Sequence, residues 1–252
     1  MTDDTANLKR LTALIDLVKL AQQQEEALRA RLSEAERNEV GTADQWSQKE
    51  VVAHLGYWKD LQANRVEALA RGDEQSEGPD WGQLNTEMWP AHAQLTWEES
   101  VAKSDQATRN LIAALERVPP DVMSNLDNEA TPGNMLIAYT LGNSLGHVAE
   151  HIANYYRGRG ESERATRAQE EAVQAIIAAD LGPGAEGSAR YNLGCYYALH
   201  GQPADAIAEL KIALARRPDL VTWARQDHDL DSLREDAAFQ ALVPPEEKSE
   251  EK

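Results

Sequence analysis

The segment GNSLGHVAEHIANYY, residues 142–156, decides how the chain is interpreted, because it places two histidines four residues apart in a stretch without proline. Apolar residues recur at nearly every turn, which predicts a helix. A helix advances about 100° per residue, so His147 and His151 are expected one above the other on one face. Two imidazoles in this arrangement can bind one metal ion; the alternative is a pair of hydrogen-bonded histidines with a structural role.

The rest of the chain predicts an all-α fold. Phenylalanine is nearly absent and β-branched residues are sparse, whereas Ala, Leu, Glu, Gln and Arg dominate, which is the composition of helices. The predicted long helices cover residues 6–38, 48–71, 97–118 and 132–157, with a short helix at 83–89. Capping-box patterns at Ser47–Glu50 and Thr96–Glu99 start the second and third of the long helices, and Pro132 suits the first position of the fourth.

The C-terminal third predicts a helical repeat. Residues 187–220 match the tetratricopeptide (TPR) pattern, with Leu193-Gly194, Tyr197 and Pro218 among the diagnostic positions. A shift of 41 residues places Tyr197 on Tyr156 and predicts a degenerate copy before the clear one. An ordinary helical hairpin is the alternative. The predicted organisation is therefore a four-helix bundle at residues 1–158, TPR hairpins with capping helices at 159–243, and a disordered acidic tail at 244–252.

Composition excludes several functional classes. The formal net charge of −18 at pH 7 repels the phosphate backbone, so we expect no binding to nucleic acid. No apolar run approaches the roughly 20 residues needed to cross a bilayer, so we expect no membrane insertion. The chain has one cysteine, Cys195, and its first residues lack the basic start and apolar segment of a secretory signal. We expect a cytoplasmic protein.

A third histidine is placed to complete a metal site. His54 lies in the apolar run VVAHLGYW, residues 51–58, where a solvent-facing histidine is not expected. A buried imidazole must form a hydrogen bond or bind a metal, because an unsatisfied buried polar group costs on the order of 1–3 kcal/mol. Three histidines with an open position form a catalytic type of site for zinc or a similar divalent ion. The remaining histidines, His92, His200 and His228, lie near loops or helix ends and are expected at the surface.

These motifs resemble a known family. WSQKEVVAHLGYW, residues 46–58, followed by HVAEH at 147–151, is similar to the DinB/YfiT-like superfamily of four-helix bundles, which includes the ClbS/DfsB group. The likeness covers residues 1 to about 158. It implies that His54, His147 and His151 hold a divalent metal, zinc or nickel. It also implies a homodimer, and an activity such as thiol-dependent transfer or hydrolysis of reactive compounds.

Other residues near the three histidines are candidates for substrate contact. Tyr57, Trp58 and Asn143 are the expected pocket wall, because one turn from each histidine is where a substrate would touch. HVAEH also matches the inverted zinc-protease pattern H-x-x-E-H, in which the glutamate, here Glu150, is the general base. Those enzymes need a larger α/β domain, so Glu150 is retained only as a weak catalytic candidate. No dinucleotide or phosphate-binding motif is present, so we expect no cofactor-binding residues of that kind.

Two functions remain open at this stage. The first is a metal-dependent thiol transferase or hydrolase that acts on an electrophilic small molecule in detoxification or stress response, with a low-molecular-weight thiol as a second cofactor. The second is a non-enzymatic scaffold, in which the bundle or the TPR region binds a protein partner or a second copy of the chain.

Overall fold

The computed structural model describes residues 2–73, 81–126 and 131–245. These residues form helices joined by turns, with one isolated bridge between Thr42 and Gln45 and no strand. The predicted all-α fold is therefore confirmed. The chain divides into two compact units, residues 1–172 and 173–252. Most of the predicted acidic tail, residues 246–252, and most of the loop after residue 73 lie outside the described residues.

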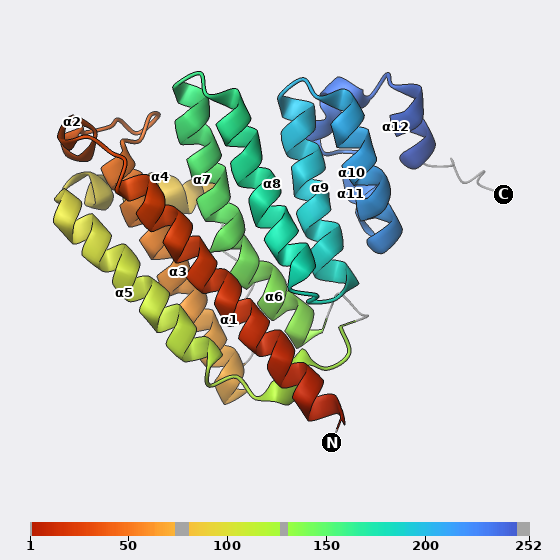
Figure 1. Ribbon diagram of the computed structural model, residues 1–252, viewed down its shortest axis with the longest axis horizontal. Coiled ribbons are helices and arrows are strands. Elements are labelled where there is room, and N and C mark those ends of the chain that lie inside the picture. The colour runs from red at the N-terminus through yellow and green to blue at the C-terminus, as the bar shows by residue number, and fades with distance from the viewer. Residues whose placement is uncertain (1, 74–80, 127–130, 246–252) are drawn as a thin grey trace. The chain divides into compact units, whose positions relative to one another are not determined.

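A four-helix bundle forms the centre of the first unit. The helices of this unit are, in chain order, α1 (Thr2–Arg29), α2 (Glu34–Asn38), α3 (Gln48–Arg71), α4 (Trp81–Ala93), α5 (Trp97–Leu115), the 3-10 helix η1 (Pro120–Met123), α6 (Pro132–Gly142), α7 (Leu145–Gly158) and α8 (Ser162–Ala178), which extends into the second unit. The long helices contact one another in a ring, α1 with α5 and α7, and α3 with α5 and α7 (Figure 1). The short helix α4 packs on α3.

Apolar side chains at helical spacing build the bundle core. Leu14 and Val18 of α1, Leu111 of α5, and Val148 of α7 are completely buried. Helices α3 and α5 approach closely because Gly56 has no side chain: a Cβ at this position would lie 2.9 Å from the Cα of Ser104. This close approach brings polar groups of α3 and α5 together in the interior.

Capping interactions explain where the helices begin. Thr96 and Glu99 exchange the two hydrogen bonds of a capping box, and α5 starts at Trp97 as predicted. The Glu50 carboxylate accepts a hydrogen bond from the Ser47 amide (2.8 Å), and α3 covers the predicted residues 48–71. The predicted single helix at 6–38 is wrong. The first helix, α1, ends at Arg29, and a further capping box at Ser33–Glu36 starts the separate helix α2.

The predicted continuous helix at 132–157 is also wrong, because it is interrupted between α6 and α7. The Ser144 hydroxyl donates to the carbonyl of Thr140, which would otherwise accept from the Ser144 amide in a continuous helix. Ser144 has φ −129° and ψ −96°, outside the helical region. The Asn143 side chain meanwhile donates to Gln62 of α3 (3.4 Å). The interruption ends three residues before His147.

A helical hairpin dominates the second unit. Its elements are α9 (Pro183–Leu199), α10 (Pro203–Arg216), α11 (Leu220–Ala224), η2 (His228–Leu233) and α12 (Ala237–Leu242). Helices α9 and α10 run antiparallel and pack closely (Figure 1). Gly194 permits this approach, because a Cβ there would lie 2.8 Å from the Leu210 side chain. The hairpin covers residues 183–216 and overlaps most of residues 187–220, where the repeat is predicted, but its assignment as a TPR and the domain boundary at residue 158 stay predictions.

Candidate metal centre

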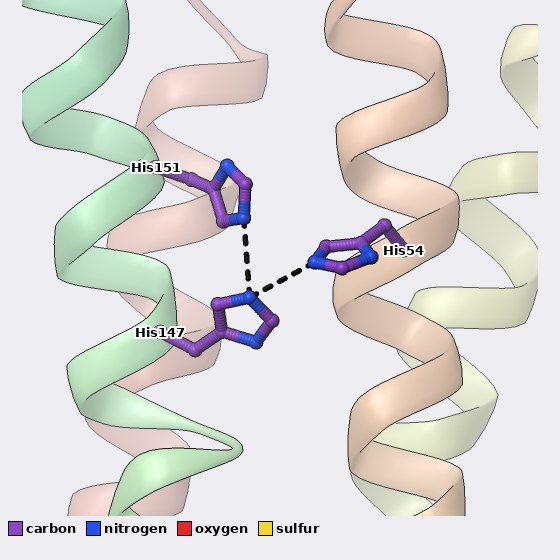
Figure 2. Close-up of side chains that lie close together, drawn as sticks. All are labelled: His54, His147 and His151. Atoms are coloured by element: carbon purple, nitrogen blue, oxygen red, sulfur yellow. Dashed lines mark hydrogen bonds between the residues drawn. The ribbon is translucent and has the colours of Figure 1, made fainter. Parts of the chain in front are cut away.

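Three histidines from two helices of the bundle converge in its interior. His147 and His151 stand one turn apart on α7, and His54 points toward them from α3 (Figure 2). Their ligand atoms all lie within 4.8 Å of one another, so the group can hold a metal ion. We call these three residues the histidine triad. The imidazole of His54 on α3 therefore lies next to those of His147 and His151 on α7, as the sequence led us to expect.

The arrangement of the three nitrogens, two of which share one neighbour, suits a metal ion better than a hydrogen-bonded cluster. His147 Nε2 lies 3.0 Å from His54 Nε2 and 3.1 Å from His151 Nε2. Each imidazole nitrogen offers either one N–H or one lone pair, so His147 Nε2 cannot form a well-directed hydrogen bond with both neighbours. A divalent ion accepts all three lone pairs. Nitrogen ligands about 2.0–2.1 Å from a tetrahedral zinc ion lie about 3.3 Å apart, close to the observed spacing.

Burial keeps the triad in the neutral form that binds metals. It is the main cause that lowers the pKa of His54 to about 2, of His147 to about 3 and of His151 to about 4. The neighbouring imidazoles lower the pKa of His54 and His147 further. At neutral pH the three rings are uncharged, so no proton has to leave before an ion binds.

The rings of the triad are held mainly by packing. The Nδ1 atoms of His54 and His147 are buried and have no hydrogen-bond partner among the described residues. The ring of His54 instead stands edge-on to Trp46, at a centroid distance of 4.8 Å, and to Trp58, at 6.1 Å. The ring of His147 lies 6.4 Å from that of Trp58. These aromatic contacts orient Nε2 toward the centre of the triad, since no acceptor among the described residues holds the Nδ1 side of the two rings.

Comparison with known families agrees with this geometry. The sequence model of the DinB superfamily matches residues 18–157, which include α3, α7 and the whole triad. The chain belongs to the DinB superfamily. Members of this superfamily often bind metal. No curated protein sequence matches the chain, and neither does any solved structure. The predicted resemblance is thus confirmed for the DinB-like part, and no family match covers the predicted TPR region.

A buried ion pair lies beside the triad of this DinB-like bundle. Lys59 of α3 donates to Glu25 of α1 (2.7 Å), and Ser104 of α5 bonds to both at 2.8 Å. The side chains of the pair are only 2% and 3% exposed. The charge of Lys59 lowers the pKa of His147, whereas that of Glu25 raises the pKa of His151. The pair is therefore close enough to act electrostatically on the site.

The predicted pocket residues occupy different surroundings. Trp58 is buried, contacts the triad and donates from its Nε1 to Asn85 of α4 (3.2 Å). Tyr57 is partly exposed and packs edge-on to Trp58. Asn143 is buried at the break before α7, where its amide faces Gln62. Glu150 is exposed, and its carboxylate is not among the three ligand groups that converge.

His92 is a residue that the sequence interpretation placed wrongly. Its side chain is buried, not at the surface, and belongs to α4. His228 is exposed, as expected, and His200 is partly exposed. The spacing of Met88, Trp89 and His92 is the available signal, because it puts all three on one face of a helix.

None of the helices within the described residues combines the length and apolarity needed to cross a membrane.

Proposed function

We propose that this protein is a metal-binding member of the DinB superfamily, and that the histidine triad holds one zinc or nickel ion. The convergence of the three Nε2 atoms, with neighbours 3.0 and 3.1 Å apart, supports this proposal most directly. We further propose a metal-dependent thiol transfer or hydrolysis of an electrophilic small molecule, in detoxification or stress response.

The protein residues have separable tasks in this activity. His54 and the α7 pair hold the ion by their neutral Nε2 atoms. A bound ion supplies Lewis acidity, which lowers the pKa of water or of a low-molecular-weight thiol. Trp58 and Trp46 orient the imidazole of His54 and exclude water from its ring faces. The Lys59–Glu25 pair places balanced charges beside the site without a net charge that would repel the ion.

Metal analysis tests the first part of the proposal. The wild-type protein, purified without a metal-affinity tag, is expected to contain a stoichiometric divalent metal by elemental analysis, and His54→Ala and His151→Ala are expected to lose it. His228→Ala is the matched control, because His228 is exposed and distant in sequence from the triad. A wild type that takes up neither zinc nor nickel contradicts the proposal, as does full metal content in both triad variants.

Activity assays test the second part. The rate of conjugation of monobromobimane to cysteine, and the hydrolysis of p-nitrophenyl acetate, are measured for the zinc- and nickel-loaded wild type and for His54→Ala. A metal-dependent rate that the variant loses supports transfer or hydrolysis. Equal rates for the loaded protein and the variant in both assays contradict it for these substrate classes.

A non-enzymatic scaffold remains the second candidate function. Among its described residues, the second unit exposes the large apolar side chains of Leu199, Ile212 and Trp223. Such side chains favour contact with a protein partner or a second copy of the chain. Light scattering of the wild type and of Trp223→Ser tests this candidate: a dimer that the variant loses supports it, and a monomer in both excludes self-association through Trp223.

A further inference from the structure

Helix α4 presents a polar and aromatic face to the region of the triad. Asn85, Met88, Trp89 and His92 are spaced as neighbours on one face of a helix. Met88 and His92 are buried, and Asn85 accepts the hydrogen bond from Trp58 on α3. This face therefore packs along the same side of α3 that carries His54.

Aromatic rings connect His92 to the triad. The ring centroid of His92 lies 6.1 Å from that of Trp46 and 6.2 Å from that of Tyr57. Trp46 in turn lies 4.8 Å from His54. Trp46 and Tyr57 are both only partly covered by other side chains. His92 thus stands behind two partly exposed rings, one of which touches a residue of the triad.

His92 has an unused hydrogen-bonding atom in this position. The residue is only 7% exposed, and its Nδ1 is buried and has no hydrogen-bond partner among the described residues. The Nε1 of Trp89, on the same face of α4, is also buried without a partner in that part of the chain. A buried polar atom left without a partner destabilises the fold, and a ligand that supplies the partner recovers this free energy.

The charges around His92 favour an acceptor that is negatively charged. Burial lowers the pKa of His92, and so does the ammonium group of Lys103, whereas Glu50 raises it less. The ring is therefore neutral at neutral pH and keeps one N–H to donate. Lys49 adds a second ammonium group nearby, bonded to the carbonyl of Ala93 at the end of α4 (3.1 Å). The Glu50 carboxylate is already engaged by the amides of Gly41 and Ser47.

We propose that His92 contacts the small-molecule substrate of the metal centre. One end of this molecule binds at the triad, its body lies against Trp46 and Tyr57, and its other end carries a carboxylate or similar acceptor for the N–H of His92. The substrate class is thus a small molecule with a metal-binding head and an anionic end. This inference rests on the proposed metal site.

A series of thiols of graded length tests the contact. Cobalt(II)-loaded protein is titrated with mercaptoacetate, mercaptopropionate and mercaptobutyrate, and with ethanethiol, propanethiol and butanethiol, and binding is followed by the visible absorption of the metal. At least one carboxylate thiol is expected to bind the wild type more tightly than the alkyl thiol of matching length. His92→Phe is expected to weaken that carboxylate thiol by roughly tenfold or more, the loss typical of a hydrogen bond to a charged group. Its affinity for the alkyl thiols is expected to be unchanged.

Two further variants separate substrate contact from structural support. His92→Gln, which keeps an N–H donor, is expected to recover part of the preference for the carboxylate. His228→Phe, which changes an exposed histidine, is expected to behave as the wild type. A His92→Phe protein that holds cobalt and keeps the wild-type preference overturns the role of His92 and leaves the metal site intact. A wild type that binds no cobalt overturns the metal site itself, and with it this inference.

A measurement on the wild type covers the case in which His92→Phe does not fold. Zinc-loaded protein with isotope-labelled histidine is examined by NMR during addition of the carboxylate thiol that binds best. The ring nitrogen resonances of His92 are expected to shift with this thiol and to stay in place with the matching alkyl thiol. Resonances that stay in place with both thiols overturn the proposal.

Discussion

Acidification is expected to destabilise the metal-free protein through the histidine triad. Burial lowers the pKa of the three rings from 6.5 to about 2, 3 and 4 in the folded protein. The unfolded chain therefore binds protons below pH 6.5 that the folded chain does not bind. Because the folded pKa values are depressed, the stabilisation by the neutral rings is complete above pH 6.5. It is lost progressively as the pH falls toward the folded values.

The size of the effect follows from these shifts. One protonation difference changes the free energy of unfolding by about 1.4 kcal/mol per pH unit. Between about pH 7 and about pH 5, each histidine of the triad is expected to remove about 2 kcal/mol, and the three together about 6 kcal/mol. This loss is a large share of the stability of an ordinary domain, about 5–15 kcal/mol.

Denaturation by guanidinium measures the loss. Chelator-treated protein is unfolded at about pH 7 and at about pH 5, and the transition is followed by far-ultraviolet circular dichroism. His147→Leu removes one of the buried titrating rings, so its loss of stability between the two pH values is expected to be smaller by about 2 kcal/mol. His228→Leu is the matched control, because the side chain of His228 is 93% exposed. If His147→Leu loses as much stability as the wild type, the rings of the triad are not the source of the acid sensitivity.

Four other outcomes are expected. Zinc at about a hundredfold excess over its Kd should raise the free energy of unfolding by about 2.7 kcal/mol, and a chelator should reverse this; an unchanged melting temperature contradicts a zinc site. Lys59→Met should cost at most about 3–5 kcal/mol in urea unfolding, because the buried Glu25 carboxylate keeps only its longer ion pair with Arg29 (3.6 Å), and the added change Glu25→Leu should recover part of the loss. A double variant no more stable than the single one refutes that explanation. Gly194→Val should destabilise the second unit by about 1–3 kcal/mol, since its side chain would collide with Leu210; wild-type stability by calorimetry counts against the close packing. Glu150→Gln should keep full metal content by elemental analysis, because the exposed carboxylate is not among the ligands, and a loss of metal would place it in the site.

Local sequence patterns predicted where several of the helices begin. The Thr96–Glu99 pattern predicted the start of α5, and residues 48–71 were predicted as the helix that is observed as α3. The box at Ser33–Glu36 was also readable, since its two hydrogen bonds need only residues three apart. The break before α7 could not be predicted from local patterns. It depends on the Ser144 hydroxyl donating to the carbonyl of Thr140, which in a continuous helix would accept from the Ser144 amide. This hydrogen-bonding arrangement is stabilised by packing against α3, where the Asn143 side chain donates to Gln62.

By itself, the sequence determined that the chain is helical and that His147 and His151 share one face of a helix, because both follow from the geometry of a few consecutive residues. Only the tertiary structure decided that His54 meets this pair, that Lys59 and Glu25 pair beside them, and that α4 buries its histidine near Trp46. These contacts join residues distant in the chain. Their distances depend on which helix faces pack together, and on close approaches such as that of Gly56 to α5.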